Sequence, residues 1–287
     1  MALTAWVNGR FLPLEQATVS IEDRGFQFAD GVYEVIACLG GSFVDLEAHL
    51  ARLEHSCEAI ALQLPLAADE LAAVIREAYR RNDFDDAMIY IQITRGVMPR
   101  SHIMADTAAP TLVVTVRQLL QPSRDKLTKG AAAITLEDIR WQRCDIKSVA
   151  LLGTVLGRLE VQRRGVDEAF WLDTEGHVLE GCSTNVLALI DGTLVTHPLD
   201  HHVLGGITRD MAFRLAREHG YAVEERPWKL TETGLSECMM TSTTTAVVPV
   251  TNIDGWAVGD GLPGDFTMQM REWMLDDYDR IRRRNQA

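Results

Sequence analysis

The chain has 287 residues, which is long enough for one large domain or two medium ones, each with its own hydrophobic core. Its 47% hydrophobic and 24% charged residues are ordinary for a globular protein, and its net charge of −13 disfavours nucleic acid and anionic membranes as partners. No apolar run approaches the roughly 18 residues of a membrane span, and the N-terminus does not resemble a signal peptide. Five scattered cysteines without a CxxC pair indicate neither a disulfide framework nor a metal site, so a reducing cytoplasm is expected.

The first part of the chain mixes strands and helices. A hairpin with Asn8-Gly9 as its turn opens the sequence. Alternating apolar residues predict further strands, and apolar residues at helical spacing predict two helices. The expected strands are 31–37, 87–95 and 111–116, and the expected helices are 46–63 and 68–82. A small N-terminal domain of both element types, 1–118, follows from this order.

The segment 119–125 contains Gln121-Pro122-Ser123 and is typical of a linker. The remainder, 126–287, is expected to form a second, larger domain. Its expected strands are 131–137, 168–173, 178–180 and 185–190, its expected helices are 148–164, 207–219 and 265–284, and 237–250 is expected to form a strand and a turn. The whole pattern predicts an α+β protein with two domains.

Lysine is scarce in this sequence. The chain has four lysines, of which Lys126, Lys129 and Lys229 stand among polar or charged neighbours. Lys147 is followed, after Ser148, by the apolar segment Val149–Leu152. Such a lysine can extend its ammonium to water. Alternatively, partial burial lowers the pKa of its amine and lets it attack an aldehyde. The lysine alone does not decide between these interpretations.

Two segments could bind a phosphate group. Gly205-Gly206 precedes a helical pattern that begins with Ile207-Thr208, and the N–H groups of a helix N-terminus favour an anion. An ordinary loop with Thr208 as the helix N-cap is the alternative. The hydroxyl run Thr241–Thr245 is either a polar turn or a phosphate cradle. Arg52, on an expected helix, is either a surface charge or a phosphate ligand.

Two further features suit recognition of charged groups. Glu180 precedes the small polar turn Cys182-Ser183-Thr184, and it could be a surface residue or the acid that keeps a pyridine nitrogen protonated. Arg100 and His102 are two residues apart, so their side chains leave an extended chain on one face. This pair is either part of an exposed basic loop or a site for a substrate carboxylate.

Taken together, these segments resemble the fold-type IV pyridoxal-phosphate enzymes, and among them the D-amino acid transaminases. The match runs in order over nearly the full length. Its most specific stretches are Glu22–Val35, Gln92–Gly96, Glu137–Trp141, Cys144–Ser148 and Gly206–Arg209. The resemblance implies a small N-terminal α/β domain and a larger, barrel-like C-terminal domain with flanking helices. It also implies a homodimer whose active site lies at the subunit interface.

The resemblance implies a role for each matching position. Lys147 would be the Schiff-base lysine and the acid/base that moves the substrate proton. Glu180 would pair with the pyridine nitrogen, and Arg140 would lie near the cofactor. The remaining residues implied to bind pyridoxal 5′-phosphate (PLP) are Arg52, Cys182, Ser183, Thr184, Leu204, Ile207, Thr208, Ser242 and Thr243. Tyr33, Arg100 and His102 would hold the substrate carboxylate, the last two from the partner subunit.

The implied activity is ping-pong transfer of the amino group of a D-amino acid, such as D-alanine or D-glutamate, to 2-oxoglutarate or pyruvate. Alternatives within the fold are an aminodeoxychorismate lyase, a branched-chain L-amino acid transaminase and an (R)-amine transaminase. A PLP-binding protein without catalysis, or a plain structural protein, is a further alternative. One departure from the family is Cys182, which stands where a serine is expected. A thiol is a weaker hydrogen-bond donor than a hydroxyl, so one contact of the turn is expected to be lost or to move to a backbone N–H.

Overall fold

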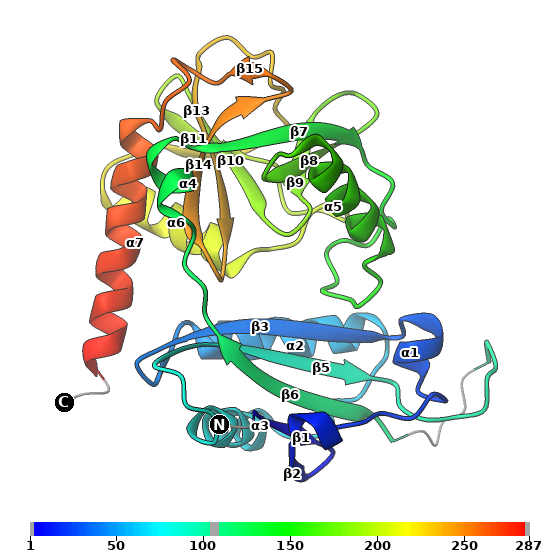
Figure 1. Cartoon of the computed structure of the whole chain (residues 1–287). Coiled ribbons are helices and arrows are strands. Elements are labelled where there is room, and N and C mark those ends of the chain that lie inside the picture. Colours follow the sequence, from blue (N-terminus) through cyan, green and yellow to red (C-terminus); the bar gives the residue numbers. More distant parts are fainter. Residues whose placement is uncertain (1–2, 104–108, 285–287) are drawn as a thin grey trace. The chain divides into compact units, whose positions relative to one another are not determined.

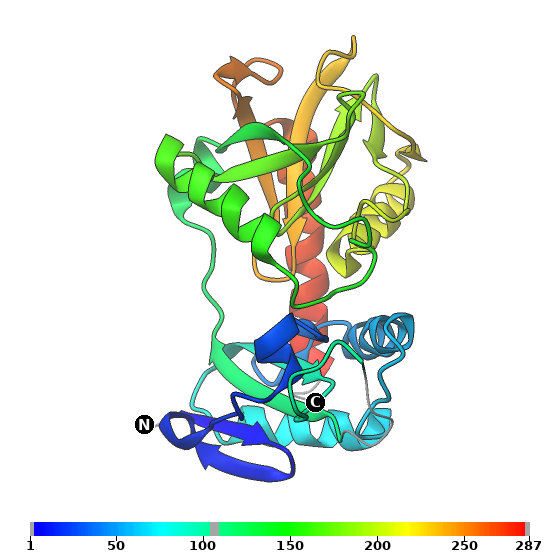
Figure 2. The ribbon, with the colours of Figure 1, turned by 90° about the vertical axis from the view of Figure 1, so that its right-hand side faces the viewer.

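A computed structural model describes residues 3–103 and 109–284 of the chain (Figures 1 and 2). The chain divides into two compact units. The first comprises Met1–Leu119, Ile146–Ala150 and Arg280–Ala287, and the second comprises Leu120–Asp145 and Leu151–Asp279. Each domain expected from the sequence is one continuous stretch of chain. The first unit of the structure instead contains two additional segments from later in the chain. Each unit is described by itself.

The first unit is built on an antiparallel sheet with the strand order β2-β1-β6-β5-β3-β4. The expected hairpin at Asn8-Gly9 is confirmed, and both turn residues have positive φ, as such tight hairpin turns require. The elements of this unit are β1 (Thr4–Val7), β2 (Arg10–Pro13), the 3-10 turn η1 (Leu14–Gln16), α1 (Arg24–Phe28), β3 (Gly31–Leu39), β4 (Ser42–Phe43), α2 (Leu46–Ala59), α3 (Ala68–Arg80), β5 (Asp86–Thr94) and β6 (Thr111–Gln118).

One face of this sheet forms the core of the first unit. Alternate residues of the long strands, such as Ile36 of β3 and Ile91 of β5, are fully buried, as the two-residue period of a strand dictates. Leu53 of α2 and Ile75 of α3 belong to the same core. The two expected helices are therefore confirmed, and both lie against the sheet (Figure 1).

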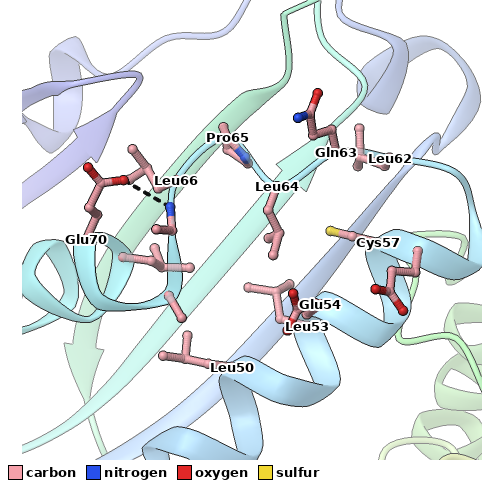
Figure 3. A pocket seen from close by; sticks show the side chains of 14 residues that line it. Leu50, Leu53, Glu54, Cys57, Leu62, Gln63, Leu64, Pro65, Leu66 and Glu70 are labelled. Atoms are coloured by element: carbon pink, nitrogen blue, oxygen red, sulfur yellow. Dashed lines mark hydrogen bonds between the residues drawn. The ribbon is translucent and has the colours of Figure 1, made fainter.

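A groove of about 590 Å³ lies between α2, the following loop and α3 (Figure 3). Leucines dominate its lining, together with Cys57 and Pro65. Glu70, another lining residue, accepts a hydrogen bond from the Ala67 N–H at 3.0 Å and so caps the start of α3. None of the site residues predicted from the sequence is among the residues that line this groove.

The segment that carries Lys147 runs along β3. The Tyr33 N–H donates to the Lys147 carbonyl at 2.9 Å, the Val149 N–H donates to the Gly31 carbonyl at 3.0 Å, and Val32 forms an antiparallel bridge with Ser148. The helix expected over 148–164 is therefore wrong at its start. Helix α5 begins at Leu152, because the residues before it are extended and spend their backbone hydrogen bonds on β3.

The second unit contains a closed barrel. The strands β10-β13-β14-β7-β8-β9 follow one another by hydrogen bonding, and β9 pairs again with β10 at Glu180 and Asn185. The strands β11 and β12 extend the sheet beyond β10, and β15 pairs with β14. The strands are β7 (Ala131–Glu137), β8 (Glu168–Leu172), β9 (Val178–Gly181), β10 (Asn185–Ile190), β11 (Thr193–Thr196), β12 (Val223–Glu225), β13 (Leu235–Ser242), β14 (Ala246–Ile253) and β15 (Trp256–Ala257).

Helices surround this barrel. Helices α5 and α6 flank it on different sides, and the long α7 packs near α6 through the stacked rings of His219 and Trp273 (Figures 1 and 2). The barrel-like domain with flanking helices implied by the resemblance is thus confirmed. No helix within residues 3–103 and 109–284 is long and apolar enough to cross a membrane. The helices of this unit are α4 (Arg124–Thr128), α5 (Leu152–Arg164), α6 (Ile207–Glu218) and α7 (Asp265–Arg284), of which the last turn counts with the first unit.

Candidate active site

Lys147 lies beside Tyr33 in the first unit. Its Nζ atom is 4.6 Å from the centre of the Tyr33 ring, which is a cation–π distance. The Tyr33 ring in turn stacks on Tyr90 of β5 with 5.6 Å between ring centres. The backbone of Lys147 is fixed by β3 and by the Ser56 hydroxyl, which accepts from its N–H at 3.3 Å. A half-buried lysine amine is therefore presented next to a tyrosine by a rigid strand.

On the other face of β3, Glu34 holds Arg52. The Arg52 guanidinium donates from Nε to Glu34 Oε1 at 2.6 Å and from Nη2 to Glu34 Oε2 at 2.9 Å. His49, one helical turn before Arg52 on α2, places Nδ1 at 2.8 Å from Glu34 Oε2. Glu34 and His49 are fully buried, and Arg52 is mostly buried. This fork fixes the direction of the guanidinium, since a buried carboxylate must be matched by donors.

The protonation states in this cluster follow from its contacts. Burial acts to raise the pKa of Glu34, but the hydrogen bonds from Arg52 and His49, together with the charge of Arg52, outweigh it and lower that pKa to about 2. Burial lowers the pKa of His49, and the Glu34 carboxylate opposes this effect only in part. Glu34 is therefore ionised, and a neutral His49 donates its Nδ1 proton to it.

Arg100 and His102 lie in the exposed loop after β5. Both side chains contact the Phe28 ring. The guanidinium carbon of Arg100 is 4.5 Å from the ring centre, and the His102 ring centre is 5.3 Å away. The structure thus brings this pair together on a common aromatic residue. Tyr33, the third predicted carboxylate ligand, is grouped instead with Lys147.

A second arginine–carboxylate cluster lies in the barrel unit. Arg140 donates from Nε and Nη2 to the two oxygens of Asp138, both at 2.9 Å, and from Nη1 to Glu180 Oε1. Its Nη2 also reaches the carbonyl of His202 at 2.9 Å. Burial acts to lower the pKa of Arg140, but the two carboxylates outweigh it and raise that pKa. One buried guanidinium is therefore shared by two carboxylates.

The second oxygen of Glu180 faces the loop before α6. Glu180 Oε2 accepts from the Leu204 N–H at 2.9 Å and from the Asn185 side-chain amide at 3.2 Å. The same amide donates to the Leu204 carbonyl at 2.8 Å. Glu180 and Asn185 therefore clasp the backbone of Leu204, and Glu180 is a positioned buried carboxylate. The alternative of a surface glutamate is wrong.

Helix α6 begins where the phosphate site was expected. Its N-cap residue is Gly206, which has no side chain to cap the helix, so the alternative in which Thr208 is the N-cap is wrong. Ile207 and Thr208 occupy the first turn, whose N–H groups have no partners within a helix. A Cβ at position 206 would lie 1.9 Å from Asn185 Oδ1, so only glycine allows this close approach.

The hydroxyl-rich turn joins β13 to β14. Ser242 Oγ lies 2.8 Å from the Thr245 hydroxyl, and buried Arg271 of α7 braces the turn by donating to the Thr245 carbonyl at 2.9 Å. Thr243 lies within the same turn. Thr241 lies opposite Asn185 in the barrel, and its buried hydroxyl oxygen has no hydrogen-bond partner in the part of the chain that the structure describes.

The three residues of the polar turn after β9 have different surroundings. Ser183 is exposed, while the Thr184 hydroxyl donates to Glu168 at 3.3 Å. The Cys182 thiol belongs to a core cluster with Val161 and Trp171, and burial raises its pKa to about 12. Ser183 and Thr184 stay predictions as cofactor ligands. Cys182 also stays one, and its thiol packs in the core.

The sequence reasoning missed Glu34, His49, Asp138 and Asn185. A signal existed for the first two. Glu34 stands at a buried position of the strand alternation, between Val32 and Ile36, so it needed a partner. His49 and Arg52 are three residues apart and therefore share one face of a helix. Asn185 carried no such signal, since its role depends on the closure of the barrel.

These donors fit a phosphorylated pyridine aldehyde. A lysine amine can bind the aldehyde carbon covalently, an arginine and an uncapped helix start can hold the phosphate, and a buried carboxylate can pair with the ring nitrogen. The orphaned Thr241 hydroxyl adds an unused polar group beside the residues that would surround the ring. These residue types are the ones that an enzyme using PLP requires.

Comparisons with known proteins give the family. The model of the class IV aminotransferases matches residues 31–253, and the chain belongs to this PLP-dependent family. It is 37% identical over 277 residues to a D-alanine aminotransferase of Listeria monocytogenes, covering 96% of each chain. The branched-chain amino acid aminotransferase of Escherichia coli has a similar structure, with a TM-score of 0.91 at 25% identity, covering 96% of this chain and 94% of that one.

A further solved structure shows the cofactor in this fold. A T.th. branched-chain amino acid aminotransferase, solved with pyridoxamine 5′-phosphate, superposes with a TM-score of 0.89 at 27% identity and covers 96% of this chain and 94% of its own. The expected fold type, aminotransferase activity and PLP dependence are therefore confirmed for this chain.

Proposed function

We propose that this enzyme transfers the amino group of a D-amino acid, such as D-alanine, to a 2-oxo acid. The observation that carries the proposal is the 37% identity, over almost the full length, to an enzyme named as a D-alanine aminotransferase. The predicted carboxylate ligands support it: Tyr33 lies beside Lys147, and the exposed side chains of Arg100 and His102 both contact Phe28. We take the amino and oxo acids as its small-molecule partners.

The two buried clusters would each act on one end of PLP. When bound, PLP supplies an electron sink for the substrate carbon that loses its proton. Arg52, aimed by Glu34 and His49, would bind the phosphate together with Ile207, Thr208, Ser242 and Thr243. Glu180 would hold a proton on the pyridine nitrogen, supported by Arg140. Leu204, clasped by Glu180 and Asn185, would pack against the ring.

Lys147 would move the substrate proton. Its Nζ would take the proton from the substrate Cα and return it to the cofactor carbon. The Tyr33 ring keeps this amine in place by cation–π attraction, which uses none of its N–H donors. Lys147→Ala should abolish the visible absorbance of the cofactor bound to the protein and lower the rate by about 10²–10⁴-fold or more. Lys126→Ala, which removes a lysine paired with Asp167, should change neither.

The substrate proposal is tested by a panel of D- and L-amino acids with 2-oxoglutarate and pyruvate as acceptors. D-Alanine with 2-oxoglutarate should give pyruvate. Turnover of L-leucine without turnover of D-alanine would refute the D-specific assignment. That result would favour the second candidate, a branched-chain L-amino acid transaminase, which the similarity to the Escherichia coli structure supports.

We propose a homodimer on the basis of helix α5. Leu152, Val155, Leu156 and Leu159 recur at helical spacing, and all four are exposed in the single chain, at 72%, 49%, 48% and 46%. Such a stripe on a helix is unusual unless another surface covers it, and a second copy of this chain is the proposed occupant. Leu156→Glu should halve the mass measured by light scattering, while Leu262→Glu, at an exposed site outside α5, should not.

We further propose a cytoplasmic location. All five cysteines are free and buried, which suits a reducing compartment. Fractionation of cells that express a tagged chain tests this proposal, and recovery of the enzyme outside the cytoplasm would refute it.

A further inference from the structure

Three predicted functional arginines are held in two different ways. Arg52 and Arg140 are each gripped by buried carboxylates. Arg100 is exposed, and no carboxylate within residues 3–103 and 109–284 forms an ion pair with it. Its described contact is the Phe28 ring, 4.5 Å from its guanidinium carbon. The difference matters because a carboxylate in the protein competes for the same N–H donors as a substrate carboxylate.

We propose that Phe28 is the positioning residue of the substrate-carboxylate site, and that it orients Arg100 and His102 together. This inference rests on the proposed function of these two residues. An aromatic face attracts a guanidinium by its quadrupole and leaves all the N–H donors available. A half-buried phenylalanine therefore restricts Arg100 to one region without occupying the donors that must fork a carboxylate.

The same ring also contacts His102 and Arg24. The His102 ring lies 5.3 Å from Phe28 at an interplanar angle of 52°. Buried Arg24 lies 4.7 Å from the Phe28 ring and donates from Nη1 to the Ser101 carbonyl at 2.5 Å. Ser101 stands between Arg100 and His102, so its backbone is anchored while the side chains on either side rest on Phe28.

This support is itself rigid. Arg24 Nε donates to Asp30 Oδ2 at 2.7 Å, and Arg95 Nε donates to the same oxygen at 2.8 Å. The Arg24 N–H donates to the Gly96 carbonyl at 2.9 Å, and Asp23 caps helix α1 at the Gly25 N–H. Phe28 ends this short helix, so its ring starts from a fixed backbone.

The test compares Phe28→Leu with Phe26→Leu in the holoenzyme. Phe26 lies on the same helix, but its side chain is 73% exposed and serves as the matched control. Phe28→Leu should raise the KM for D-alanine about 3- to 30-fold, the range expected for a cation–π contact. The kcat, the PLP content and the melting temperature should change little, and Phe28→Tyr, which keeps the ring, should restore the KM. Phe26→Leu should leave the KM unchanged.

A double-mutant cycle with Arg100→Ala distinguishes the carboxylate-binding role of Arg100 from the positioning role of Phe28. If Phe28 acts through Arg100, Phe28→Leu should add little once Arg100 is gone. An Arg100→Ala variant with an unchanged KM would refute the carboxylate site itself. A raised KM in Arg100→Ala alongside an unchanged KM in Phe28→Leu, or fully additive effects, would refute the role of Phe28 alone.

Fluorination provides a variant that keeps the shape of the side chain. Fluorinated phenylalanines at position 28 weaken the ring quadrupole with little change in volume. The KM for D-alanine should rise stepwise with the number of fluorine atoms. A KM independent of fluorine number would overturn the proposal even if Phe28→Leu failed to fold.

Discussion

The two buried arginine clusters are built with opposite stoichiometry. In the first unit one carboxylate, Glu34, is matched by Arg52 and by a neutral His49, so the cluster sums to zero and Lys147, when protonated, adds one positive charge. In the barrel unit one guanidinium, Arg140, is shared by Asp138 and Glu180, so the sum is −1. The first cluster suits an anion such as a phosphate, and the second suits a protonated pyridine nitrogen.

The difference also changes what each glutamate does. Glu34 spends both its oxygens on Arg52 and His49, and therefore acts only through the arginine that it aims. Glu180 shares its arginine partner, Arg140, with Asp138, so the cluster has one excess negative charge. Its second oxygen accepts from the Leu204 N–H. We therefore expect Glu34 to influence cofactor affinity and Glu180 to influence the rate of the chemical step.

The largest effect is expected for Glu180→Gln. An amide cannot hold the positive charge on the pyridine nitrogen, so the rate of the half-reaction should fall about 10²–10³-fold, the cost of losing one preorganised electrostatic partner. Stopped-flow measurement of the D-alanine half-reaction checks this. Glu237→Gln, which alters a barrel carboxylate that caps α7 by accepting from the Phe266 N–H, serves as the control and should react at the normal rate. A normal rate in Glu180→Gln would remove the distinction between the clusters.

The next effect concerns pH. The pKa of Glu34 is about 2 in the folded chain against an ordinary value of 4.5, so its contribution to stability is full above about pH 4.5 and is lost as the pH falls towards 2. The natural enzyme should have a larger free energy of unfolding than the Glu34→Gln variant. This difference should shrink by about 3 kcal/mol as the pH falls from 4.5 to 2. Urea unfolding at pH values from 6 down to 3.5 should show the two curves converging. Parallel curves would contradict the ionised state of Glu34.

Glu34→Gln should also weaken PLP binding by about 10- to 100-fold, because Arg52 loses the charged hydrogen bonds that aim it. Pyridoxal, which lacks the phosphate, should bind the variant and the natural enzyme equally. Titration of the apoenzyme with both compounds measures this ratio. An equal loss for PLP and pyridoxal would indicate general damage to the unit and not a misdirected Arg52.

The smallest effect is expected for His49→Gln. A neutral donor to Glu34 is replaced by another, so the affinity for PLP should fall only about 2- to 10-fold. Because the pKa of His49 lies below its ordinary value of 6.5, the affinity of this variant should keep the pH dependence of the natural enzyme between pH 7 and 8. If the PLP affinity of the natural enzyme depends on pH in this range and that of His49→Gln does not, His49 is charged.

The sequence supports the fold well where local patterns decide it. Strands 131–137 and 185–190 and helix 265–284 were expected with the bounds that the structure has, because apolar runs and helical spacing act over short distances. The start of α5 was wrong because the Lys147 segment bonds to β3, which lies more than a hundred residues earlier. The short strands β11, β12 and β15 were missed because they depend on their neighbours in the sheet.

The candidate site shows the same division. Lys147, Arg52, Glu180 and Arg140 were proposed through the family resemblance, whereas the buried partners Glu34, His49 and Asn185 were not. Asp138 stands two residues before Arg140 and could have been inferred as its ion-pair partner. The contact between Phe28 and Arg100 joins residues 72 positions apart, and no pattern along the chain indicates it.

The seam of the barrel gives Glu180 a further significance. Strands β9 and β10 meet where Glu180 pairs with Asn185, and the side chains of the same two residues join Glu180 to Leu204. The group proposed to bind the ring nitrogen is thus part of the closure of the barrel. Any molecule that binds Glu180 only when the seam is closed stabilises the whole cylinder by mass action. Amide hydrogen exchange at Gly181 and Leu204 would then report cofactor occupancy. Loss of PLP would appear as faster exchange of these amides at the barrel seam.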